Sequence, residues 1–88
     1  MIEKNIVINL EDGVHARPAA MFVEKASSYD SNISIKKDDV VVNAKSIMSI
    51  MMLALTKDTE IFLIIDGEDE IEAMDDLYSF MINGFKEV

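Results

Sequence analysis

The spacing of apolar residues changes several times along this chain, and each change marks the boundary of a predicted helix or strand. In the N-terminal segment, apolar and polar residues alternate as in a strand with one buried face, up to a turn expected at Asp12-Gly13. From residue 16 to residue 28 the spacing becomes helical, and Pro18 fits only the first turn of such a helix, where its missing N–H costs nothing. The alternating strand residues are Ile2, Ile6, Ile8 and Leu10.

A hairpin and a central strand are predicted next. Residues 33–36 alternate in polarity, residues 40–42 are three valines, and Lys37-Asp38-Asp39 connect the two segments. This connection lacks the glycine that hairpin turns usually contain, so its turn type stays open. Residues 61–65 form a continuous apolar run, which suits a central strand covered on at least one face.

Two further helices complete the pattern. Residues 46–54 indicate a short helix with Ser46 as its N-cap. In the last helix, Asp69 and Glu72 suggest a capping box at the start, and Asn83-Gly84 supply a stop. Its apolar stripe is expected to be Ile71, Met74, Tyr78, Met81, Ile82 and Phe85. The order of elements predicts the α+β class, as an open-faced two-layer α/β sandwich with helices on one face of a mainly antiparallel sheet.

Composition excludes several kinds of site. The 88 residues are enough for one small domain. The absence of cysteine rules out disulfides and thiolate metal sites, and a single histidine rules out a multi-histidine metal site. The N-terminal segment does not resemble a signal peptide, and residues 47–55 are only about half as long as a membrane span. We therefore expect a cytoplasmic protein with no metal site and no membrane insertion.

The net charge of −9 comes entirely from the last third of the chain. Residues 1–57 hold seven acidic and seven basic residues, whereas residues 58–88 hold ten acidic residues and only Lys86. Such a run is most often a solvated helix face. An acidic surface also argues against nucleic acid as a partner, because phosphate contacts need clustered Lys and Arg.

The only histidine, arginine and proline of the chain fall within four positions, where the first strand passes into the first helix. At a helix start, unpaired N–H groups and the positive end of the dipole favour an anion. The same environment disfavours a protonated ring, so we expect His15 to be neutral and nucleophilic. Arg17 adds a planar fork of donors that matches phosphate oxygens. The group suits a histidine that accepts a phosphoryl group, although such a histidine is more often a cap or a surface residue.

Two motifs identify the chain as similar to a known family. Residues 13–19, G-V-H-A-R-P-A, resemble the active-site signature of the HPr phosphocarriers of the bacterial sugar phosphotransferase system. Residues 42–48, V-N-A-K-S-I-M, resemble the regulatory-serine segment of the same family. The resemblance covers nearly the whole chain and implies a single HPr-like domain over residues 1–88. It also implies a βαββαβα fold with a four-stranded antiparallel sheet of order 1-4-2-3 and three helices on one face.

The resemblance implies a carrier of phosphoryl groups. His15 would take the group on Nδ1 from phosphorylated enzyme I and pass it to the A domains of sugar-specific enzymes II, with Arg17 supporting the phosphate. Such a protein is an intermediate in transfer rather than a stand-alone enzyme, needs no cofactor and is expected to be a monomer. A hydrolase with His15 as general base is a weaker alternative, because the sequence shows no cysteine nucleophile or evident triad.

Ser46 has a second role by resemblance. In some members of the family the matching serine is phosphorylated by an ATP-dependent HPr kinase/phosphorylase, which hinders docking to enzyme I and assists a catabolite-control transcriptional regulator. As an N-cap, Ser46 needs no further function. An HPr-like regulatory protein that acts mainly through Ser46, in carbon or nitrogen control, is therefore the alternative to a sugar carrier. Such paralogues generally lack the active histidine, which this chain retains.

The helix that follows Ser46 is apolar on nearly every side, so it must either be buried or offer one face to a partner. We expect Ile50 and Leu53 to face the core. By resemblance, the partner-binding residues are Ala16, Ala20, Ile47, Met48 and Met51. The chain departs from the family pattern at Ala20, Glu24, Asp39, Val40, Ser49 and Ala54. Because enzyme I surfaces that receive these carriers tend to be acidic, Glu24 is expected to affect partner choice.

Overall fold

A computed structural model describes residues 1–86 and contains four strands and three helices within them. The elements are, in chain order, β1 (Ile2–Val7), α1 (Ala16–Ser27), β2 (Asn32–Lys37), β3 (Val40–Asn43), α2 (Ile47–Met52), β4 (Glu60–Asp66) and α3 (Glu70–Ile82). This βαββαβα order is the one expected from the spacing of apolar residues.

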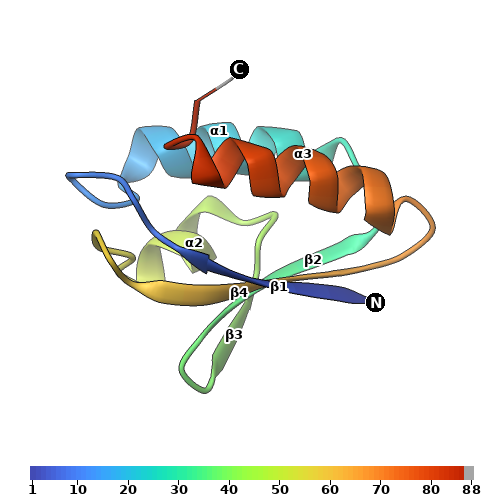
Figure 1. Cartoon of the computed structure of the whole chain (residues 1–88), viewed down its shortest axis with the longest axis horizontal. Helices are drawn as coiled ribbons and strands as arrows, with labels where there is room; N and C mark the ends of the chain where they lie inside the picture. The colour runs from blue at the N-terminus through green and yellow to red at the C-terminus, as the bar shows by residue number, and fades with distance from the viewer. Residues whose placement is uncertain (87–88) are drawn as a thin grey trace.

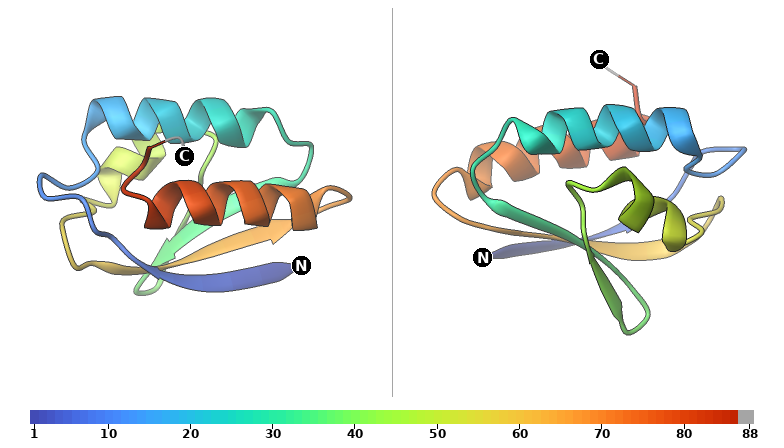
Figure 2. Two further views of the ribbon diagram at one scale, coloured as in Figure 1. Left: turned by 45° about the horizontal axis from the view of Figure 1, so that its top comes forward. Right: turned by 180° about the vertical axis from the view of Figure 1, so that it is seen from behind.

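The strands form one antiparallel sheet in the order β1-β4-β2-β3, with the helices on one of its faces (Figure 1). Strand β4 lies in the interior of the sheet, between β1 and β2. Helices α1 and α3 run side by side above it, and α2 packs against α1 and β3 (Figure 2). The predicted fold class and strand order are confirmed.

Alternate residues of β4 form the centre of the core. Ile61, Leu63 and Ile65 are fully buried beneath the helices, whereas Phe62 and Ile64 point to the other face and are half-buried. The apolar run predicts a strand covered on at least one face, and in the structure the helices cover one face of β4. No helix among the described residues covers the outer face of the sheet (Figure 1).

Strand β1 ends earlier than its sequence pattern predicts. Its pairing with β4 stops at Val7, because β4 begins only at Glu60 and, within residues 1–86, no strand lies opposite the residues beyond. Ile8 is nevertheless buried, and its backbone exchanges hydrogen bonds with Thr59 and Asp58 at 2.9 and 2.7 Å. The alternation of exposed and buried residues therefore continues to Ile8, one residue beyond the last pair between β1 and β4.

The predicted apolar stripe of α3 is wrong at Ile71 and Ile82, and its last member, Phe85, is buried but lies beyond the end of the helix. Ile71 and Ile82 are 68% and 45% exposed. Helix α3 packs against β1 and β4 on one side and α1 on another, so its buried sector is broad and turned away from these two residues. The buried residues of α3 are Ala73, Met74, Leu77, Phe80 and Met81.

The predicted capping box at the start of α3 is also wrong. The carboxylate of Asp69 accepts hydrogen bonds from the backbone N–H groups of Asp30 and Ser31, at 2.8 and 3.0 Å, and from the Ser31 hydroxyl. The hydrogen bond from the Ser31 side chain, together with the backbone donors, lowers the pKa of Asp69. Asp69 therefore connects the start of α3 to the loop before β2 instead of capping its own helix. The neighbouring carboxylate of Glu70 accepts a hydrogen bond from the N–H of Gly67.

The predicted stop of α3 and the predicted hairpin agree with the structure, whereas α2 ends at Met52, before the predicted residue 54, and Lys37 still pairs with Val40 at the end of β2. Asn83 is the C-cap of α3 and Gly84 follows with a φ of +76°, a conformation that suits glycine. The hairpin reverses at Asp38 and Asp39, and Asp38 adopts a φ of +54°, which aspartate tolerates better than most residues. This explains how the turn forms without glycine.

Charge is unevenly distributed over the fold. Residues 66–76, which contain seven acidic side chains, cover the end of β4 and the first half of α3. This part lies at the opposite end of the molecule from the loop that joins β1 to α1 (Figure 1). Within residues 1–86, no helix is both long and apolar enough to cross a membrane.

Candidate functional site

His15 is the N-cap residue of α1 and is exposed to solvent. Its backbone is extended, with φ −91° and ψ −169°, and its carbonyl accepts the first helical hydrogen bond from Ala19 at 3.1 Å. The side chain makes no capping bond, and within residues 1–86 the imidazole has no hydrogen-bond or ionic partner. The ring is therefore neither a side-chain cap nor a core residue.

The start of α1 presents donors beside this ring. The backbone N–H groups of Ala16 and Arg17 have no acceptor within the described residues, and Pro18 has no N–H to offer. The Arg17 guanidinium is exposed and has no ionic partner in the same part of the chain. Two unpartnered amides at the helix start, together with an exposed arginine two residues from an exposed histidine, are groups that suit an anion such as a phosphoryl group. The structure thus exposes both His15 and Arg17 at the start of α1.

Tight packing holds the turn that leads to His15. Gly13 adopts a φ of +73°, and a Cβ there would lie 2.7 Å from the carbonyl oxygen of Leu55. The same oxygen accepts a hydrogen bond from the N–H of Val14, at 2.8 Å. Glycine is required because the backbone at position 13 closely approaches the segment after α2. No local pattern around Gly13 predicts this contact with Leu55.

Helix α2 is divided between the core and the surface, as expected. Ile50 and Leu53 are buried, which confirms their predicted orientation. The predicted partner-binding residues of α2, here called the docking patch, are Ile47, Met48 and Met51, and all three are exposed. Met52, the neighbour that sequence reasoning did not include, is 80% exposed. On α1, Ala16 is exposed and Ala20 is half-buried.

Ser46 begins α2 as its N-cap, as predicted. Its side-chain oxygen accepts a hydrogen bond from the N–H of Ser49 at 3.3 Å. The preceding residue, Lys45, donates from Nζ to the carbonyl oxygen of Tyr29 at 2.7 Å, which fastens this segment to the end of α1. Ser46 is half-buried.

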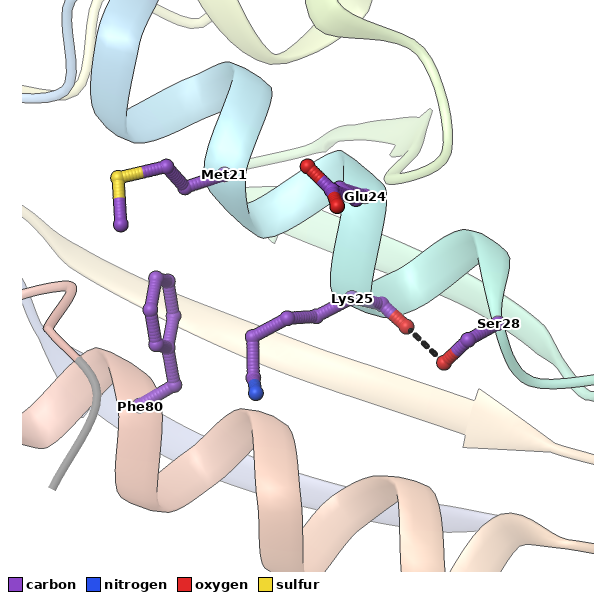
Figure 3. A pocket seen from close by; sticks show the side chains of 5 residues that line it. All are labelled: Met21, Glu24, Lys25, Ser28 and Phe80. Carbon is purple, nitrogen blue, oxygen red and sulfur yellow. Dashed lines mark hydrogen bonds between the residues drawn. The ribbon is translucent and has the colours of Figure 1, made fainter.

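A pocket of about 320 Å³ lies between α1 and α3, further along α1 from His15 (Figure 3). It is lined by Met21, Glu24, Lys25, Ser28 and Phe80. Lys25 is engaged there, because its Nζ lies 3.0 Å from the Asp76 carboxylate and 5.3 Å from the centre of the Phe80 ring. Glu24 has no ionic partner within residues 1–86, so it adds an uncompensated negative charge to this side of α1.

A family model described as the phosphorylation site of the HPr component of the PTS matches residues 2–83. The chain belongs to the HPr family. It is an HPr-family phosphocarrier, and the match spans every helix and strand, including the His15 turn and α2.

Both branches of the HPr family occur among the relatives. The HPr-like protein Crh of Halalkalibacterium halodurans is 48% identical over 81 residues, covering 92% of this chain and 96% of that protein. The phosphocarrier protein HPr of Treponema pallidum is 40% identical over 87 residues, covering 99% of each. The crystal structure of HPr-C-His from Thermoanaerobacter tengcongensis matches with a TM-score of 0.92 and 43% identity over the full length of both chains.

Proposed function

We propose that this HPr-family chain carries a phosphoryl group between enzyme I and the A domains of sugar-specific enzymes II. Nδ1 of His15 attacks the phosphorus of phosphorylated enzyme I, so that an N–P bond forms while the bond between phosphorus and enzyme I breaks. The reverse exchange with an enzyme II A domain removes the group. The observation that supports this most directly is the free, exposed imidazole beside two unpartnered amides and Arg17 at the start of α1.

The local donors suit a transient phosphoryl group. Negative charge develops on the phosphoryl oxygens, and we expect it to be stabilised by the free N–H groups of Ala16 and Arg17 and by the guanidinium of Arg17. The docking patch on α2, with Ala16 and Ala20 on α1, would form the contact surface for both partners. Exposed methionines suit such a surface because they adapt to more than one shape.

Regulation through Ser46 is the second candidate, and the Crh relative of H. halodurans favours it. A phosphate on Ser46 would sit at the N-terminus of α2, which tolerates negative charge, and would add ~1.5 to 2 negative charges beside the docking patch. It would thereby hinder docking to enzyme I, with HPr kinase/phosphorylase and a catabolite-control regulator as further partners. Retention of His15 supports the carrier role over a purely regulatory one.

We further propose that residues 1–88 form one domain that works as a cytoplasmic monomer, without membrane insertion or binding to nucleic acid. Relatives of known structure include an HPr dimer from T. tengcongensis, 42% identical to this chain. Sedimentation at micromolar concentration tests the monomer, and a dimer under these conditions would contradict it.

The carrier role is tested with enzyme I of the same organism and radiolabelled phosphoenolpyruvate. We expect acid-labile phosphate on the wild type and on Ser46→Ala, and none on His15→Ala. Absence of label on the wild type would overturn the carrier role, and rapid release of inorganic phosphate would indicate a hydrolase instead. In cells, sugar uptake that survives His15→Ala would favour the regulatory candidate.

A further inference from the structure

Lys37 connects the end of β2 to the end of α2, and the proposed transfer step does not use it. Its Nζ donates a hydrogen bond to the carbonyl oxygen of Leu53 at 2.7 Å and a longer one to that of Ala54 at 3.4 Å. These carbonyls end α2, whose own last turn contains no basic residue. A cation at a helix C-terminus satisfies free carbonyls and interacts favourably with the helix dipole. Lys37 therefore supplies, from a neighbouring strand, the charge that α2 lacks.

The next carbonyl along the chain, that of Leu55, holds the turn before His15. It accepts the N–H of Val14 at 2.8 Å, and the side chains of Leu55 and Val14 are both buried. Between the two contacts, Ala54 adopts a φ of +50° and turns the chain away from the helix axis. Three consecutive carbonyls, at positions 53–55, thus link Lys37 to the residue directly before His15.

We infer that Lys37 is a positioning residue for phosphoryl transfer. Its ammonium group fixes the segment 53–55, and this segment fixes the His15 turn relative to the docking patch on α2. Lys37 does not touch the phosphoryl group and acts only through Leu55 and Val14. The inference rests on the proposed function of His15.

The neighbouring lysine provides a matched control. Lys36 lies on the same strand but points to the opposite face, pairs across the sheet with Phe62 and Val41, and makes no side-chain hydrogen bond within residues 1–86. Lys37→Met keeps the apolar stem and removes the donors, and Lys36→Met makes the same chemical change at a site without the contact. Lys37→Arg keeps charged donors.

Amide hydrogen exchange tests the link without reference to function. The N–H of Val14 is compared with that of Leu63 in the central strand, which reports global unfolding. We expect Val14 to exchange about tenfold faster in Lys37→Met, equivalent to ~1.4 kcal/mol, while Leu63 changes much less. Lys36→Met should leave Val14 unchanged, and Lys37→Arg should restore most of its protection. Equal exchange of Val14 in Lys37→Met and Lys36→Met would overturn the inference.

Transfer kinetics test the functional part. With phosphorylated enzyme I as donor, Lys37→Met should lower kcat several-fold and leave KM nearly unchanged, because the docking patch is retained while His15 is misplaced. A loss of stability alone would not separate kcat from KM in this way, so an unchanged kcat would refute the role in transfer. If the wild type accepts no phosphate, the role in transfer fails together with the proposed function, and hydrogen exchange alone then decides whether Lys37 holds the turn.

Discussion

Replacing Ala54 with glycine is expected to stabilise the fold, because this residue occupies a conformation that disfavours a Cβ atom. Ala54 follows the C-cap of α2 with a φ of +50°, and its side chain is exposed. A left-handed conformation costs an L-residue roughly 1 to 2 kcal/mol, and glycine does not pay this cost. Glycine also loses more backbone entropy than alanine on folding, and this loss cancels roughly 0.5 to 1 kcal/mol of the stabilisation. The expected net gain is therefore about 0.5 to 1 kcal/mol.

For a chain of this size, such a gain corresponds to a rise in Tm of about 2 to 8 °C. Differential scanning calorimetry and urea unfolding should both show it, with an unchanged m-value. The control is Ala20→Gly, in the middle of α1, where φ is helical and glycine should cost about 1 kcal/mol. If Ala54→Gly lowers Tm as Ala20→Gly does, the left-handed turn is not strained and the reasoning fails.

Three further changes can be measured on the same protein. Ser46→Ala removes the N-cap of α2 and should cost about 1 kcal/mol in urea unfolding, whereas Ser46→Asp keeps a capping oxygen and should cost less. Because hydrogen bonds from Ser31 and from backbone N–H groups lower the pKa of Asp69 in the folded state, its stabilising contribution is complete above about pH 4 and is lost as the pH falls through that lowered pKa. The difference in Tm between wild type and Asp69→Asn should therefore shrink on acidification, and a constant difference would contradict this. Glu24→Lys should lower KM for an enzyme I with an acidic docking surface without changing kcat, and the effect should vanish at high salt.

Local patterns were enough to predict the order of elements and the exposed site, because those features depend on residues close in sequence. The helix start at His15 and the N-cap at Ser46 follow from a few consecutive residues, and Ile50 and Leu53 follow from helical spacing. The family resemblance added the strand order 1-4-2-3, which periodicity alone does not determine.

The errors arose where the outcome depends on distant contacts. Helix α3 is apolar on several sides, so packing against β1, β4 and α1 determines which side is buried. Helical spacing alone therefore puts Ile71 and Ile82 in the core, whereas both are exposed. Asp69 has the sequence signature of a cap, but its carboxylate accepts hydrogen bonds from the loop before β2 instead of capping α3. The contacts of Lys37 with Leu53 and of Val14 with Leu55 join segments far apart in the chain, and no local pattern predicts them.

The concentration of acidic side chains in residues 66–76 gives the molecule a permanent electric dipole, since these residues lie at the end remote from the β1–α1 loop (Figure 1). In the field of a negatively charged protein, the acidic end is repelled and the end with His15 turns to face the approaching surface. This torque acts before contact and raises the fraction of collisions that occur in a productive orientation. It weakens at higher salt, because the screening length is only about 10 Å at 0.1 M and shortens further above that. Negative charge placed at the far end can thus improve the orientation in which the molecule meets an anionic partner, even though the net charge of −9 slows the approach itself.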